Sequence, residues 1–154
     1  MEESLAEEPS TSDPYVIDGW DSRAPVSGLS DAALRRARIV AEALFSTEAG
    51  PPPAARLDWM ERDLADFFGN VSVRARLVFR LCVAVVYFLA PLLNGRLRTM
   101  GSLDVEERVR ALHRIEATPL SIAYLGCKVI LCMVYFEHPD AAAEIGWDQR
   151  CLTP

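Results

Sequence analysis

The feature that most constrains the fold is the apolar segment at residues 72–93, which carries no charged residue after Arg80. After Arg80 a helix over this segment is apolar on every face, and such a helix has to be buried all round. Its uncharged part, residues 81–93, has 13 residues and a helical length of about 20 Å, whereas the hydrocarbon core of a bilayer requires about 30 Å. We therefore predict a central core helix that Pro91 kinks or ends, with a membrane-seated segment as the alternative.

A second apolar helix is predicted at residues 120–136, where Thr118-Pro119 opens the segment and Lys128 is the one charged residue. Because this segment is also almost wholly apolar, we expect it to pack against the helix at residues 72–93 as the other half of the core. The side chains predicted to be largely buried in this two-helix core are Leu81, Val85, Phe88, Leu125 and Leu131.

Apolar residues recur with helical spacing in three more segments, each preceded by a capping residue or a proline-rich break. These segments are residues 31–45 after Ser30, residues 56–68 after Gly50 and prolines 51–53, and residues 103–116 after Ser102. A short helical turn ending at Gly146 follows. The sequence shows no strand alternation and no repeat of 20–50 residues, so we predict an all-α, single-domain bundle of five or six helices over residues 29–154.

Residues 1–28 combine acidic and hydroxyl side chains with prolines and glycines. Because this composition cannot bury enough apolar surface to order itself alone, we interpret the segment as an extended arm. Within it, Tyr15, Ile17 and Trp20 are too apolar for a purely solvated tail, and we predict that they anchor the arm on a partner protein. The alternative is that the arm folds back over an apolar groove of its own bundle.

The charge distribution argues against a nucleic-acid partner. Seven carboxylates precede the first basic residue, Arg23, whereas the chain from Ser22 onward holds 15 acidic and 16 basic residues. A surface that follows nucleic-acid phosphates needs a concentrated basic excess, which is missing here. The start of the sequence has no basic-then-apolar leader and no twin-arginine pair, so the cytoplasm is the default location, with peripheral membrane attachment or export with a partner as alternatives.

The residues with reactive side chains are not spaced as a catalytic, metal or cofactor site requires. The eight glycines form no GxGxxG turn, so we expect no dinucleotide cofactor on this chain. The four cysteines form no CxxC pair, and neither His113 nor His138 stands in a metal-ligand spacing with them. Cys132, the thiol nearest His138 in sequence, lies in an apolar helix, where a thiol is inert. We therefore predict buried free thiols, no metal site and no enzymatic activity.

Arg74 and Arg76 stand at the start of the apolar helix, where positive charges oppose the helix dipole. Such side chains gain more from the carboxylate of a partner than from their own helix. We predict both arginines as partner-binding residues, with solvated side chains as the alternative.

Three short segments and one lysine in the second half of the chain occur in the same order as the motifs of a known family. They are residues 102–108, Lys128, residues 135–139 and residues 146–148. This order resembles the gluconate 2-dehydrogenase subunit 3 family, which has a Leu-Ser-Pro-Glu-Glu-Arg-like helix start, a Leu-Lys core, a Tyr-Tyr-x-Asp-Pro end and a Gly-Tyr-Asp close. The front helix and the proline-rich break are similar too, so the resemblance covers residues 28–148. The sequence departs from the family pattern at His138 and Trp147, which replace Asp and Tyr, and in the missing twin-arginine leader.

The resemblance implies a non-catalytic small subunit that binds a large flavoprotein of the glucose-methanol-choline oxidoreductase type and supports its assembly or maturation. FAD is then expected on that partner, an alcohol, sugar or steroid dehydrogenase, and no cofactor on this chain. A similar segment precedes the flavin domain in long-chain alcohol oxidases. Trp147, in the Gly-Tyr-Asp position, joins the predicted partner-binding residues.

The alternative function is that of a membrane-associated helical anchor. In this interpretation the two apolar helices dip into the bilayer. The side chains that then meet lipid phosphates are Arg74, Arg76, Arg96 and Arg98.

Overall fold

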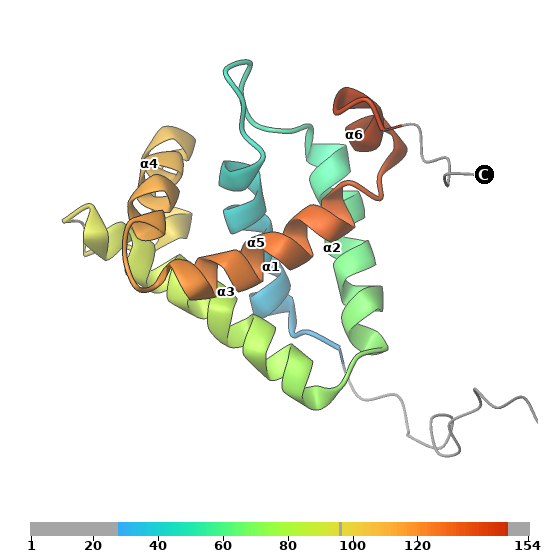
Figure 1. Ribbon diagram of the computed structural model, residues 1–154, viewed down its shortest axis with the longest axis horizontal. Helices are drawn as coiled ribbons and strands as arrows, with labels where there is room; N and C mark the ends of the chain where they lie inside the picture. Colours follow the sequence, from blue (N-terminus) through green and yellow to red (C-terminus); the bar gives the residue numbers. More distant parts are fainter. Residues whose placement is uncertain (1–27, 96, 148–154) are drawn as a thin grey trace, which may run out of the picture.

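A computed structural model describes residues 28–95 and 97–147 of the protein, and this part is an all-helical bundle without a β-strand (Figure 1). The predicted arm at residues 1–28 lies outside the described residues except for Gly28. The helices are α1 (Asp31–Leu44), α2 (Ala54–Gly69), α3 (Val73–Leu93), α4 (Val105–Glu116), α5 (Ser121–Tyr135) and α6 (Pro139–Glu144). The prediction of an all-α bundle of five or six helices is confirmed.

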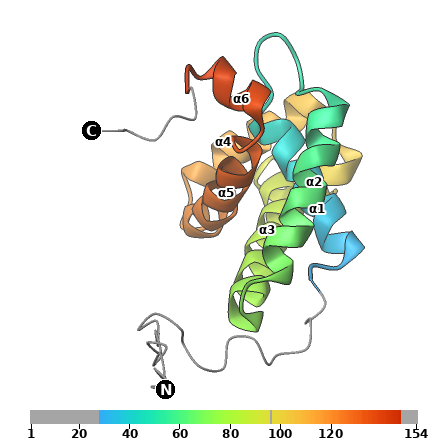
Figure 2. The same ribbon diagram turned by 90° about the vertical axis from the view of Figure 1, so that its right-hand side faces the viewer.

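Helix α1 packs through a face of small residues. Ala37, Val40 and Ala41 are fully buried on this face, and Ala33 extends it toward the helix start. Because alanine side chains are short, the neighbouring helices approach α1 closely, and α1 contacts α2, α3, α4 and α5. In the side view of Figure 2, α1 lies at one edge of the bundle and α5 and α6 lie at the other.

Helix α3 is not buried on all sides, so the prediction of an all-round buried core helix is wrong. One face packs inward through Phe79, Val83 and Val86, and Ser72 caps the helix by accepting a hydrogen bond from the amide of Ala75 at 3.3 Å. The opposite face is open, and the side chain of Leu81 is 63% exposed. The physical reason is that α1, α4 and α5 cover only one side of α3, and no further helix of the described part covers the other.

Helix α5 shows the same two-sided character. It does pack against α3, as predicted, and Leu131 is fully buried, but Leu125 points outward with 59% of its surface exposed. Phe88 is likewise exposed and Val85 is only half-buried. The core therefore draws on more helices than the two predicted, because α2 and α4 also fill it. Their fully buried side chains, with one from the connection before α4, are Met60, Leu64, Phe68, Ile115 and Met100.

The predicted start of α4 needs correction. Asp104, not Ser102, is its capping residue, because the Asp104 carboxylate accepts a hydrogen bond from the amide of Glu107 at 2.7 Å. An acidic side chain at this position also interacts favourably with the helix dipole. Ser102 ends a short 3-10 turn and donates its hydroxyl hydrogen to the carbonyl oxygen of Thr99 at 2.9 Å.

The predicted end of the apolar helix at Leu93 is confirmed, but Pro91 does not end the helix, because α3 runs through it for two more residues. The predicted glycine after the last helix is also confirmed. Helix α6 is followed by Gly146, whose φ of 76° lies in the left-handed region that favours glycine.

An ion pair between Arg56 of α2 and Glu144 of α6 fixes the position of α6. The Arg56 guanidinium donates to both carboxylate oxygens of Glu144 at 2.9 Å and to the hydroxyl oxygen of Tyr135 at 3.0 Å. The ring of Tyr135 in turn stacks on Phe45, with 3.7 Å between the ring centroids. This chain of contacts joins the end of α1, the start of α2, the end of α5 and α6.

We expect the docking of α6 to weaken in acid. The hydrogen bond from Arg56 lowers the pKa of the Glu144 carboxyl group, so its contribution is present above the ordinary glutamate pKa and is lost as pH falls through the lowered value. Hydrogen exchange of the α6 amides, corrected for the intrinsic rate, should therefore lose protection on acidification. The variant Glu144→Gln should show low protection at every pH. A wild-type protection factor that does not change with pH would contradict this assignment.

Candidate docking surface

Cys127, Cys132 and His138 lie in surroundings that favour structural roles over reactive ones. Burial raises the pKa of the Cys127 and Cys132 thiols, so both favour the protonated form. His138 accepts a hydrogen bond from the amide of Asp140 at 3.2 Å through Nδ1, at the start of α6. Within residues 28–95 and 97–147, no group of three or more His, Cys, Asp or Glu side chains is placed to hold a metal ion.

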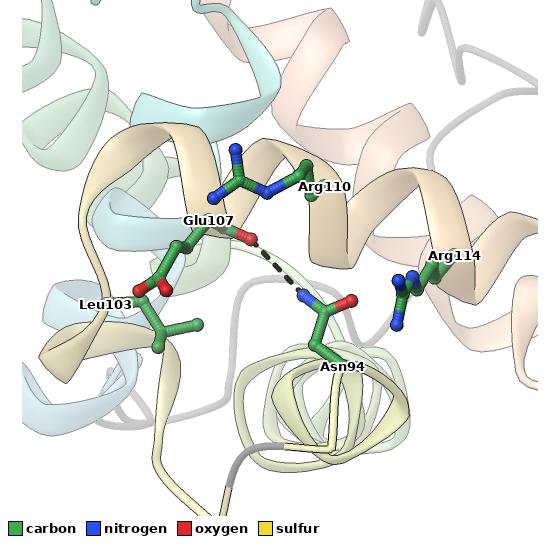
Figure 3. Close-up of a pocket in the computed structure, with 5 residues that line it drawn as sticks. All are labelled: Asn94, Leu103, Glu107, Arg110 and Arg114. Carbon is green, nitrogen blue, oxygen red and sulfur yellow. Dashed lines mark hydrogen bonds between the residues drawn. The ribbon is translucent and has the colours of Figure 1, made fainter.

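A small pocket of about 140 Å³ lies where the end of α3 meets α4 (Figure 3). The Asn94 side chain donates to the carbonyl oxygen of Glu107 at 3.4 Å, and Arg114 donates to the carbonyl oxygen of Leu93 at 3.0 Å. Carbonyl groups in the last turn of a helix lack partners within that helix, and cations stabilise this end of the helix dipole. The pocket residues therefore tie the end of α3 to α4.

The outward face of α3 is the largest departure from an ordinary soluble helix. Its apolar side chains point away from the face that holds Phe79 and Val83, since the helix turns by about 100° per residue. The exposed apolar side chains of this face are Leu77, Val78, Leu81, Phe88 and Leu92. Soluble monomers rarely expose an apolar stripe of this length, which indicates an interaction site.

Helix α5 adds a second stripe beside the first. Gly126 faces Cys82 of α3, and a Cβ atom at Gly126 would lie 3.2 Å from the Cys82 sulfur, so the glycine permits a close approach of the two helices. The exposed apolar side chains of α5 are Ile122, Leu125, Val129 and Met133. Because the two helices pack against each other, we call these nine exposed residues of α3 and α5 the α3–α5 surface.

The start of α5 is hollowed. A recess of about 360 Å³ is lined by the apolar side chains of Ile122 and Leu125 together with Glu116 and Lys128. The Lys128 ammonium lies 3.2 Å from a carboxylate oxygen of Glu116 and 5.4 Å from the centre of the Tyr124 ring. Ile122 is 79% exposed at the edge of this recess. An apolar floor with a charged rim is the arrangement found in protein interfaces.

The predicted partner-binding residues fall into three groups. Tyr15, Ile17 and Trp20 lie outside the described residues. Arg74 is exposed at the start of the α3–α5 surface, and Trp147 is 49% exposed after α6. Arg76 has only 6% of its surface exposed, so a partner docked on α3 would meet Arg74 more readily than Arg76.

The sequence interpretation missed the apolar residues of the surface itself because it assigned Leu81, Phe88 and Leu125 to the core. Local sequence signals do not identify them, because an exposed apolar side chain in such a helix has the same chemistry as one in the core.

Two residues of the stretches that carry the family resemblance have contacts within the bundle. Lys128 pairs with Glu116, and Tyr135 stacks on Phe45 and accepts a hydrogen bond from Arg56. These contacts stabilise the bundle and do not identify a partner. Comparisons with protein-family models, with curated proteins and with solved structures find no match to this chain, so its assignment to the gluconate 2-dehydrogenase subunit 3 family stays a prediction.

Proposed function

We propose that this protein is a non-catalytic small subunit that docks on a large flavoprotein through the α3–α5 surface and supports its assembly or maturation. The observation that carries the proposal is the exposed apolar face shared by α3 and α5. The sequence resemblance supplies the class of partner, a glucose-methanol-choline type dehydrogenase of an alcohol, sugar or steroid that carries the FAD.

The energy of covering this surface supports a stable complex. Full burial of a leucine side chain contributes about 1.5–3 kcal/mol. Leu77, Leu81 and Leu125 are each more than half exposed, so a partner that covers them gains about 1 kcal/mol or more from each. The Glu116 and Lys128 side chains at the recess add polar contacts that fix the orientation of the partner.

A membrane-associated anchor is the second candidate, because α3 is long and apolar enough to cross a membrane by length and composition. A span by α3 would, however, remove Phe79, Val83 and Val86 from the core, where they are buried. The packing of α3 against α1, α4 and α5 therefore favours a protein partner over insertion. An anchor that leaves the core intact would instead contact the lipid surface through the α3–α5 surface without inserting α3.

We expect the isolated protein to be colourless and without dehydrogenase activity, and to acquire a flavin only through its partner. The test is to express the tagged full chain in its source organism and to purify it with its bound proteins. The eluate should hold a large subunit of glucose-methanol-choline type with the visible absorbance of oxidised flavin. Flavin absorbance on the chain alone, or elution without such a subunit, contradicts the proposal.

A vesicle experiment separates the two candidates. The purified chain, without detergent, is mixed with anionic phospholipid vesicles and sedimented. Under the proposal the chain stays in the supernatant, whether or not the partner is present. Sedimentation with the vesicles that disappears in Leu77→Glu and Leu81→Glu would support the anchor instead.

A further inference from the structure

We propose that in the free protein the apolar segment of the N-terminal arm, Tyr15 to Trp20, covers the first half of the outward face of α3. The proposed occupant is a segment of this same chain, so the inference does not rest on the identity of any partner. The arm covers this part of the α3–α5 surface before a partner binds. A partner that docks there must then displace the arm.

The described chain begins next to the proposed site. Gly28 lies against the last turn of α2, where a Cβ atom would be 3.3 Å from the carbonyl oxygen of Ala65 and 3.7 Å from the nitrogen of Gly69. Helix α3 starts only four residues after Gly69, at Val73. Figure 1 shows the start of the described chain close to the connection between α2 and α3. The described chain therefore begins beside the end of α2, which lies four residues before α3 starts.

The length of the arm fits the distance to be covered. Trp20 precedes Gly28 by eight residues, which span at most about 26–29 Å when extended. The exposed first half of α3, from Val73 to Leu81, is about 12 Å long along the helix axis. Trp20 thus reaches any point of this segment with slack, and Tyr15, five residues earlier, reaches it as well.

The charges of the two elements are complementary. The arm carries seven carboxylates before its first basic residue, Arg23, and two of them, Asp18 and Asp21, lie next to Trp20. Helix α3 contains no acidic residue, and Arg74 and Arg80 are exposed on its first half. No ion pair joins either arginine to another residue of the described part. These charges add to the positive end of the helix dipole, which favours an acidic segment here.

The apolar side chains also match. Leu77 and Val78 lie between the two arginines and Leu81 directly follows Arg80, and each of the three side chains is at least 60% exposed. Tyr15, Val16, Ile17 and Trp20 supply the apolar surface that such a stripe requires, and the neighbouring Asp18 and Asp21 meet the arginines. A segment with this pattern covers the apolar side chains of the stripe and also pairs with the arginines at its edges. A purely solvated tail would do neither.

The test places the photoreactive analogue benzoylphenylalanine at Tyr15 of the full chain, irradiates the isolated protein and maps the cross-links by mass spectrometry. We expect cross-links within one chain to residues 73–81. The charge-reversal pair Arg74→Glu and Arg80→Glu should lower their yield about three- to tenfold, since it turns two attractions into repulsions. The matched control, Arg98→Glu with Arg110→Glu, makes the same charge change beyond the other end of α3 and should leave the yield unchanged.

Three results would overturn the proposal. They are cross-links that join two chains, cross-links confined to other parts of the bundle, and a yield that Arg74→Glu with Arg80→Glu does not change. Because the experiment uses the isolated protein, its failure leaves the proposed flavoprotein partner untouched, and failure to find that partner leaves this result standing.

Discussion

Replacing Leu131 by alanine is expected to lower the free energy of unfolding by about 2–5 kcal/mol, because it opens a cavity in a closely packed core. The same change at Leu125, on the same helix, should cost less than about 1 kcal/mol. Leu131 is fully buried, whereas Leu125 is 59% exposed, so the pair compares one chemical change on the two faces of α5. Denaturant midpoints of both variants, with unchanged m-values, provide the measurement.

This comparison tests the corrected core directly. If α5 were enclosed on all sides, as its sequence suggests, both variants would lose similar stability. Equal losses at Leu131 and Leu125 would therefore contradict the two-faced description of α5, and with it the α3–α5 surface. A small loss at both positions would contradict the burial of Leu131.

The existence of each helix was predictable from local signals. Ser30 before an apolar periodic segment, the prolines at 51–53 and the glycine at 146 act through the nearby backbone, and each marks a real helix boundary. The start of α4 was harder to predict because serine and aspartate are both favoured at helix starts, and Ser102 and Asp104 lie only two residues apart. The choice depends on the 3-10 turn that uses the Ser102 hydroxyl, which local propensity does not show.

The orientation of the apolar helices was not predictable from composition alone. An amphipathic helix such as α1 shows which face is buried because its other face is polar. In α3 and α5 both faces are apolar, so Leu81 and Leu125 resemble Val83 and Leu131 in the sequence, and only the positions of neighbouring helices distinguish them. For the same reason the exposed residues of the α3–α5 surface were not predictable, since an exposed apolar residue and a core residue have the same chemistry.

The double variant Leu77→Glu and Leu81→Glu is expected to weaken binding of the flavoprotein partner about 100-fold or more. Two apolar contacts are lost, and two charges would be buried without partners in the complex. The free energy of unfolding of the isolated protein should change by less than about 1 kcal/mol, because both side chains are exposed in the bundle. The matched control, Leu97→Glu with Ala143→Glu, adds the same charge at exposed positions outside the α3–α5 surface and should bind as the wild type does.

The most direct test of the docking surface is the dissociation constant of the complex, measured by titrating the isolated FAD-bearing subunit with wild-type protein, the double variant and the control. The account predicts that the dissociation constant rises about 100-fold or more in Leu77→Glu with Leu81→Glu and stays at the wild-type value in the control. Thermal unfolding of the same samples should show cooperative transitions with melting temperatures within a few degrees of one another for all three proteins. Wild-type affinity in the double variant, with its fold intact, would contradict the claim that the outward face of α3 and α5 binds the partner.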